Sequence, residues 1–232
     1  LIAAADFARR EDCGDDLSDV VCRNINFTNV CYVVYSFCGF ARHKDDHAEA
    51  FDRTHAEILA KCEDAVQRGA TEFCIQGGIH PNKDHTHYRE ILTALKAAFP
   101  QVHIHAFSPE EIDHGHKQSG MALADYLTWL KDAGLDTIPG TAAEILDDEI
   151  RQVIEPRKLG TARWVEIIEA AHRVGLRSTA TVMYGHVEQP RHVAAHMGTI
   201  REIQKRTGGF TEFVPLGFIH EKNRLFQHLH AR

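Results

Sequence analysis

The sequence predicts an α/β protein built as a partial TIM-type barrel of six strand–helix units. Short apolar segments alternate six times with longer segments whose apolar residues recur at helical spacing. Six such units also fit a doubly wound sheet. The barrel is favoured because polar residues and glycines follow the strands, at the face where barrel enzymes carry their chemistry. No composition break interrupts the 232 residues, so we expect one domain over residues 1–232.

The elements can be justified in order along the chain. Residues 1–20 predict a helical lead-in with a turn at 13–16. The alternation from Asn24 to Thr28 predicts a strand that runs into a loop, and a loop is also expected over 43–51. A capping box at Thr54 opens a helix that ends at Gly69. Later strands are predicted over 71–76, 102–107, 135–138, 178–183 and 210–216, with helices around 88–99, 123–130, 142–153, 164–171 and 190–203.

Composition and charge limit the classes of function. At 44% hydrophobic the chain can bury a sizeable core, and its net charge of −7 argues against nucleic acid as a partner. No apolar run approaches the roughly 20 residues that span a bilayer, and the start shows no secretory signal. Six cysteines in a chain this long do not make a disulfide scaffold, so we expect a reduced, cytoplasmic protein.

The loop after the first strand holds two cysteines, Cys31 and Cys38, with aromatic residues between them. It resembles the Cys-x3-Cys-x2-Cys loop of radical S-adenosylmethionine (SAM) enzymes, in which thiolates hold a [4Fe–4S] cluster and the open iron binds SAM. Tyr35 stands at the middle cysteine position, and a phenol oxygen is a poor ligand for a sulfur-rich iron. Simple burial of the two thiols is the plainer alternative.

Polar groups and glycines follow the later strands. Gly77 and Gly78 come directly after the second strand, where they either form a turn or let backbone carbonyls approach the ammonium group of a ligand. Other polar residues are expected at the mouth of the barrel, where the strands end, and would suit a hydroxylated, nitrogen-rich ligand. They are Glu144, Tyr184, His186, Glu188, Glu212 and His220.

A zinc hydrolase is an alternative interpretation. His103 and His105 are two residues apart on one face of the third strand, as in amidohydrolase-type barrels. Further ligands or a base would come from other strand ends: His186, His220, Glu188 and Glu144. Against this, the amidohydrolase pair sits on the first strand, which has no histidine here. Alternatively, one of the two histidines faces a polar substrate and the other packs outside.

Longer motifs at successive strand ends resemble FO synthase, and in particular its tyrosine-using half. The similarity runs from about Asp15 to His220. Menaquinone-pathway radical SAM enzymes share the pattern less closely. The motifs are Asn24-Ile-Asn-Phe-Thr-Asn-Val-Cys-Tyr, Gln76-Gly-Gly-Ile-His-Pro, His103-Ile-His-Ala-Phe-Ser-Pro, Thr137-Ile-Pro-Gly-Thr-Ala-Ala-Glu-Ile-Leu-Asp-Asp-Glu, Met183-Tyr-Gly-His-Val-Glu and Gly209-Phe-Thr-Glu-Phe-Val-Pro-Leu.

The resemblance implies a [4Fe–4S] cluster, SAM, and transfer of the 4-hydroxybenzyl group of L-tyrosine to 5-amino-6-(D-ribitylamino)uracil. It also implies a reductant protein and a second radical SAM half that closes the deazaflavin ring. By position it implies cluster ligands at Cys31 and Cys38, cofactor contacts at Phe37, Gly77, Gly78 and Ser108, and pocket residues at His105, Glu144, Tyr184, His186 and Glu212.

Two departures from the family pattern leave the activity open. Tyr35 replaces the middle cysteine, and Val34 replaces the glycine that usually precedes it. The family's chains also continue past the point where this one stops, and this one starts without a methionine, so we expect a fragment. The alternatives to an active transferase are an inactive paralogue that only binds ligand and a damaged copy.

Overall fold

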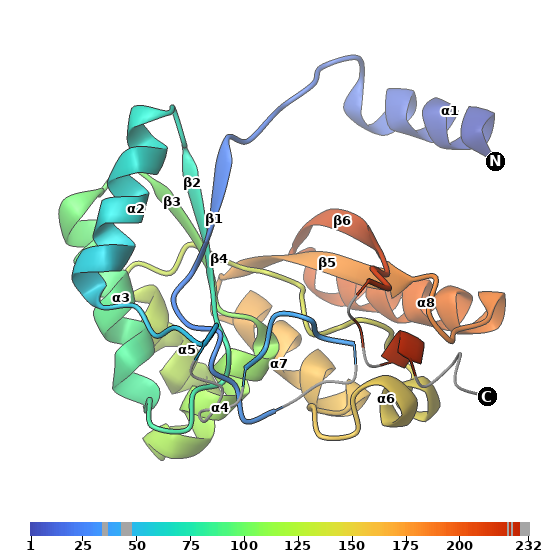
Figure 1. The fold of residues 1–232 in the computed structure, drawn as a ribbon. Helices are drawn as coiled ribbons and strands as arrows, with labels where there is room; N and C mark the ends of the chain where they lie inside the picture. The colour runs from blue at the N-terminus through green and yellow to red at the C-terminus, as the bar shows by residue number, and fades with distance from the viewer. Residues whose placement is uncertain (34–36, 43–47, 222, 224, 228–232) are drawn as a thin grey trace.

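A computed structural model describes residues 1–33, 37–42, 48–221, 223 and 225–227. Six parallel strands form one sheet in the order of the sequence, and Figure 1 shows it as a strongly twisted half-barrel. The predicted six-unit half-barrel is therefore confirmed. The strands are β1 (Cys22–Asn26), β2 (Glu72–Gln76), β3 (His103–Ala106), β4 (Thr137–Ile138), β5 (Arg177–Tyr184) and β6 (Phe210–Gly217).

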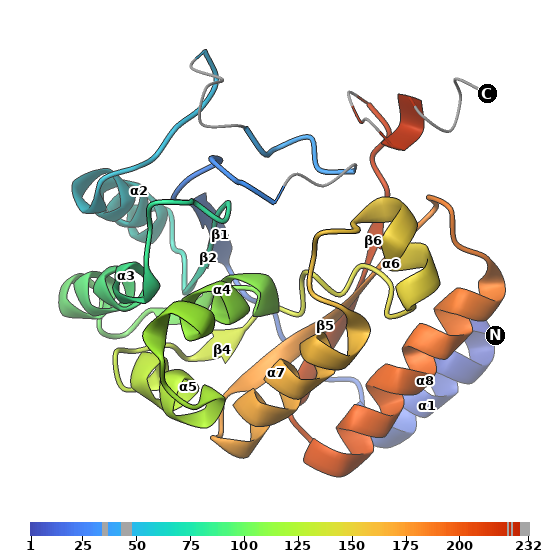
Figure 2. The ribbon, with the colours of Figure 1, turned by 90° about the horizontal axis from the view of Figure 1, so that it is seen from below.

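Helices cover the outer face of this sheet, as Figure 2 shows from below. They are α2 (His55–Gln67), α3 (His85–Ala98), α4 (Pro109–Ser119), α5 (Leu123–Lys131), α6 (Asp148–Ile154), α7 (Thr161–Arg173) and α8 (Pro190–Thr207). Each strand is joined to the next through at least one of them, which is the connection that parallel strands require. The carboxyl ends of the strands consequently meet at one rim, where the connecting loops can build a site.

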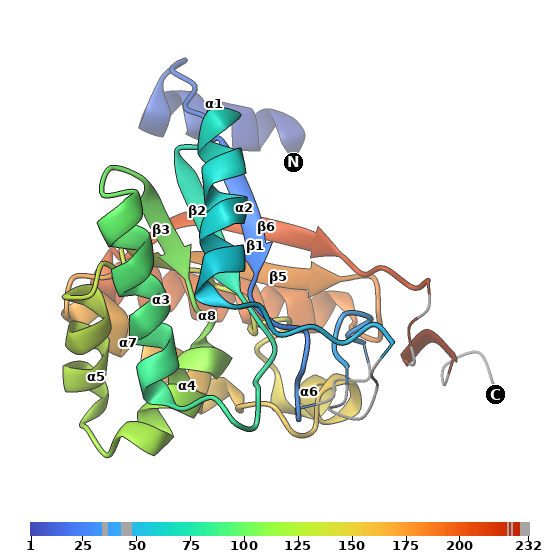
Figure 3. The same cartoon turned by 60° about the vertical axis from the view of Figure 1, so that its left-hand side comes forward.

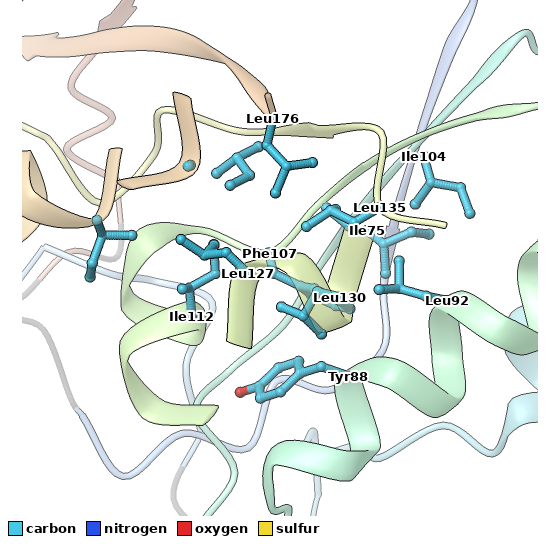
Figure 4. Close-up of a cluster of buried hydrophobic side chains, with 14 of the residues drawn as sticks. Ile75, Tyr88, Leu92, Ile104, Phe107, Ile112, Leu127, Leu130, Leu135 and Leu176 are labelled. Carbon is cyan, nitrogen blue, oxygen red and sulfur yellow. The ribbon is translucent and has the colours of Figure 1, made fainter. Parts of the chain in front are cut away.

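The core lies between the sheet and these helices. Alternate residues of the first strands, such as Ile25, Ile75 and Ile104, point into it and are almost fully buried, whereas Cys74 and His105 belong to the opposite, inner face. Figure 4 shows part of this cluster, with Tyr88 of α3 beneath it. The inner face is left to polar residues and glycines, so the hollow of the half-barrel can take a polar ligand.

Two predictions about helices were wrong. Helix α4 was not predicted, because its buried side includes Glu111 and Asp113 and therefore lacks an apolar stripe. Its start signal was present: Ser108 and Glu111 form a capping box with proline at the first helical position. Helix α6 starts at Asp148 and not near residue 142, because Ala142 and Glu144 hold positive φ angles of 66° and 45° that no α-helix tolerates.

The N-terminal helix, α1 (Ile2–Cys13), buries none of its residues, and Figures 1 and 3 show it away from the sheet. It ends at Cys13, where the predicted turn begins, and residues 16–20 of the predicted lead-in are not helical. Of the loop expected over residues 43–51, positions 43–47 lie outside the described residues. Across the part of the chain that the structure describes, no helix combines the length and the apolar character needed to cross a membrane.

Candidate active site

A cavity of about 200 Å³ lies at the carboxyl ends of β1 to β4. Asn26 and Gln76 reach it from the ends of their strands, and the loops that follow close its sides. Seven residues singled out from the sequence line this cavity together: Cys31, Phe37, Cys38, Gly77, Gly78, Ser108 and Glu144. The structure therefore brings most of the predicted cofactor contacts to one place.

The two thiols of the loop after β1 differ in exposure. Cys31 is 3% exposed and its Sγ donates a hydrogen bond to the Val33 carbonyl at 3.2 Å. Burial raises the pKa of this thiol, so an electropositive partner such as a metal is needed to favour the thiolate. Cys38 is partly exposed. Among the described residues no third cysteine lines the cavity, and Tyr35 lies outside the described residues.

The Gly77–Gly78 turn packs directly against the cysteine loop. A Cβ on Gly78 would lie 2.3 Å from the Val30 carbonyl oxygen, and one on Gly77 would lie 2.5 Å from the Phe27 ring. The Gly78 N–H donates to the Thr28 carbonyl at 2.9 Å, which ties the two segments together. Glycine is therefore required at Gly78 by the close approach of two backbones and at Gly77 by the Phe27 ring, reasons additional to any ligand contact.

Sequence reasoning missed Glu111, the residue that holds this turn. Its carboxylate accepts hydrogen bonds from the Gly77 N–H at 3.0 Å and from both the N–H and the hydroxyl of Ser108 at 2.7 Å. The side chain is buried, and this burial raises its pKa to about 7, although the three hydrogen bonds act in the opposite direction. The Ser-x-x-Glu capping box was the available sequence signal.

Sequence reasoning also missed a buried charge network beside the cavity. The Lys158 ammonium donates to Glu144 at 2.7 Å and to Glu155 at 3.0 Å, and it lies 5.4 Å from the centre of the Phe37 ring. Burial alone would lower the pKa of Lys158, but the two carboxylates outweigh it and raise the pKa. Lys158 therefore stays charged and fixes the Glu144 carboxylate at the cavity.

Arg151 holds the loop that carries Glu144. Its guanidinium is buried, is paired with Glu155 at 2.8 Å, and donates to the backbone carbonyls of Ala142, Ala143, Ile145 and Leu159. These bonds compensate for the left-handed backbone at two non-glycine residues of the loop. The charged side chain thus fixes a loop conformation that the local sequence disfavours.

Four predicted pocket residues lie away from this cavity. His105 and Glu212 line a second hollow of about 600 Å³, which lies toward the amino-terminal ends of the strands. Tyr184 is 49% exposed at the end of β5, and His186 packs against Glu188 at 3.3 Å. The expectation of a single mouth is wrong for Glu212, because β6 begins only two residues before it.

The zinc hydrolase alternative finds no support in this geometry. His103 and His105 both contact the Thr137 hydroxyl at 2.7 Å, and no group of three potential ligands within the described residues includes either histidine. Thr137 pairs with Arg177, six residues before Met183, so His186 lies about 20 Å further along the strand direction. These histidines therefore cannot share an ion with His186.

A parallel half-barrel with thiols and a glycine pair at the carboxyl ends of its first strands places this chain among barrels of the TIM type, which build their sites at that rim. The model of the Radical SAM superfamily matches residues 25–200, and the chain belongs to this superfamily. The solved structure of methylornithine synthase aligns with 97% of the chain and 60% of its own, with a TM-score of 0.74 and 15% identity. That comparison supports the fold.

Curated relatives confirm the resemblance to FO synthase. The chain is 52% identical over 226 residues to FO synthase of Mycobacterium tuberculosis, covering 97% of this chain and 26% of that protein. It is 47% identical over 220 residues to 5-amino-6-(D-ribitylamino)uracil–L-tyrosine 4-hydroxyphenyl transferase of Methanothermobacter thermautotrophicus, covering 95% of this chain and 60% of that protein. The chain thus spans about a quarter of the first relative and three fifths of the second.

Proposed function

We propose that this chain is the barrel of a radical SAM transferase that joins the 4-hydroxybenzyl group of L-tyrosine to 5-amino-6-(D-ribitylamino)uracil. The observation that carries the proposal is the identity of 47% over 95% of the chain to a relative with that name. The cavity supports it, because the residues expected to contact the cofactors line one hollow at the carboxyl rim. A barrel of this family places its reaction at that rim.

In this proposal Cys31 and Cys38 supply two thiolates to a [4Fe–4S] cluster. Their donor chemistry fits iron, since thiolates are the usual ligands of such clusters. The bound cluster supplies the electron that splits SAM. Gly77 and Gly78 offer backbone atoms to the methionine part of SAM, and Phe37 flanks its adenine. Ser108 completes the cofactor contacts. Glu111 holds the glycine turn in place by accepting a hydrogen bond from the Gly77 N–H.

Glu144 at the cavity and three predicted residues outside it are assigned to ligand binding. The Glu144 carboxylate, held by Lys158, accepts hydrogen bonds from hydroxyl or amine groups of a ligand. Tyr184 and His186 contact a substrate from the end of β5, and His105 does so from the inner face of β3.

The proposed partners follow from the relatives that the chain resembles. They are L-tyrosine, the ribitylaminouracil, a reductant protein, and the second radical SAM half of an FO synthase. We propose a cytoplasmic location, supported by the six free thiols that a reducing compartment maintains. Nucleic acid is not among the partners, because the net charge is −7.

The deciding experiment compares the natural chain with Tyr35→Cys after anaerobic reconstitution with iron and sulfide. We expect the natural chain to retain iron and to form 5′-deoxyadenosine from SAM when reduced, and Tyr35→Cys to retain more iron, about four atoms per chain. Tyr32→Cys is the matched control, because it adds a thiol to the same loop away from the motif position.

Two outcomes would overturn the proposal. If iron binds only to Tyr35→Cys, the natural chain is a relative that has lost its cluster. If the natural chain forms 5′-deoxyadenosine but gives no coupled product with L-tyrosine and the ribitylaminouracil, the reaction class stands and the substrates are wrong. Iron counting identifies the first outcome, and mass spectrometry of 5′-deoxyadenosine and the coupled product identifies the second.

A further inference from the structure

Helices α2 and α3 lie side by side on the outer face of the half-barrel, as Figures 1 and 3 show. Their N-terminal halves bring together three groups that have no part in the cavity. His55 is the first residue of α2, and His87 and Glu90 lie three residues apart on α3. The spacing on α3 puts the imidazole and the carboxylate on one face of that helix.

These three side chains converge on one point. One ligand atom from each of His55, His87 and Glu90 lies within 4.8 Å of the other two. The two imidazole rings are stacked, with centres 6.1 Å apart and planes at 20°. Two imidazoles and a carboxylate are the donors that zinc takes in three-ligand sites.

His87 provides an independent observation. The residue is only 7% exposed, and its Nε2 atom is buried with no hydrogen-bond partner. An unsatisfied buried polar atom is rare in folded proteins and costs stability unless something contacts it. Its ring packs edge-on with that of Phe27, with centres 5.4 Å apart.

The protonation state of His87 suits a metal. Burial lowers its pKa to about 4, assisted by Lys83, so the imidazole is neutral at pH 7 and need not lose a proton to bind an ion. Lys83 is itself paired with Asp52 at 3.0 Å, which reduces its repulsion of a cation. The positive ends of the two helices oppose a cation, but this effect is small beside three coordinate bonds.

We propose that His55, His87 and Glu90 bind a zinc ion that links the N-terminal halves of α2 and α3. Tetrahedral zinc holds its ligand atoms about 3.4 Å apart. The adjustment to this spacing falls on the partly exposed His55 and the exposed Glu90, while the buried His87 stays in place. A water molecule takes the fourth position. The site is independent of the proposed transferase function.

The test is a calorimetric titration of the whole chain with Zn²⁺, repeated on variants. The chain also has thiols that bind zinc, so the measurement is made in parallel on the double variant Cys31→Ser/Cys38→Ser. We expect one site of micromolar or tighter affinity in both proteins. His55→Gln and Glu90→Gln should each weaken it by about tenfold or more. Glu63→Gln, an exposed change on α2, is the matched control and should leave it unchanged.

A second measurement guards against misfolding. Zinc should raise the unfolding temperature of the natural chain and of Glu63→Gln, but not of His55→Gln, whose own unfolding temperature without zinc should match that of the natural chain. The proposal is overturned if the affinity is the same in His55→Gln, if binding disappears in the double cysteine variant, or if it requires millimolar zinc, which would mean adventitious binding.

Discussion

Replacing Glu111 with glutamine tests how the glycine turn is held at the cavity. The carboxylate is 1% exposed and accepts one hydrogen bond from Gly77 and two from Ser108. A glutamine side chain has the same shape, but its NH2 group would face donors at one of the two positions where the carboxylate oxygens accept hydrogen bonds. Leaving a buried donor without an acceptor costs about 1–3 kcal/mol, so the variant should be less stable at acidic pH, where neither side chain is charged.

The sign of the pH dependence follows from the raised pKa. Burial raises the pKa of Glu111 from 4.5 to about 7, so the folded state keeps the proton that the unfolded chain loses. The stability that this proton contributes is fully present below pH 4.5 and is lost as the pH rises through 7. At about 1.4 kcal/mol per pH unit, the loss is about 3 kcal/mol. Glutamine does not titrate, so Glu111→Gln should lack this loss.

Urea denaturation at pH 4.5 and pH 8 measures the effect as a difference between two proteins. The free energy of unfolding of the natural chain, relative to Glu111→Gln, should fall by about 3 kcal/mol between the two pH values. Glu63→Gln, which changes an exposed carboxylate, should show no such change. A difference that stays constant to within 1 kcal/mol would refute the argument that Glu111 is buried and titrates near neutrality.

Two more substitutions probe the walls of the cavity. Gly78→Ala places a Cβ 2.3 Å from the Val30 carbonyl oxygen, so it should lower the free energy of unfolding, measured in urea, by about 1–3 kcal/mol. Gly39→Ala is the control and should lower it little, because its Cβ meets no atom within 4 Å. Equal losses in the two variants would contradict the packing argument. Arg151→Met leaves Glu155 buried without this partner and should lower the free energy of unfolding by about 3–5 kcal/mol. The double variant Arg151→Met/Glu155→Leu should recover part of this loss. A double variant less stable than Arg151→Met would argue against the pair.

The sequence was informative wherever a local pattern decides structure. The capping box at Thr54 opens α2 as predicted, and its side chain accepts from the Glu57 N–H. The meeting of the cysteine loop with Gly77 and Gly78 was also predictable, because neighbouring parallel strands end at one rim. These features depend on the order of apolar and polar residues and on chain connectivity, both of which can be read along the chain.

The sequence was uninformative where burial decides the role of a charged side chain. Glu111, Arg151 and Lys158 occupy positions that read as ordinary helix or loop residues, and their importance comes from neighbours that are distant in the sequence. Glu212 was misplaced for a related reason. Periodicity locates a strand but does not say at which of its residues the strand reaches the rim.

By itself, the amino-acid order determined the six strand–helix alternations, the parallel sheet and the family resemblance, since these rest on periodicity, caps and motifs that act over a few residues. Only the tertiary structure decided which carboxylates face the cavity, that the buried Glu111 titrates near neutrality, and that His55 and His87 meet across two helices. The physical reason is that pKa values and side-chain contacts depend on desolvation and on neighbours brought together by folding.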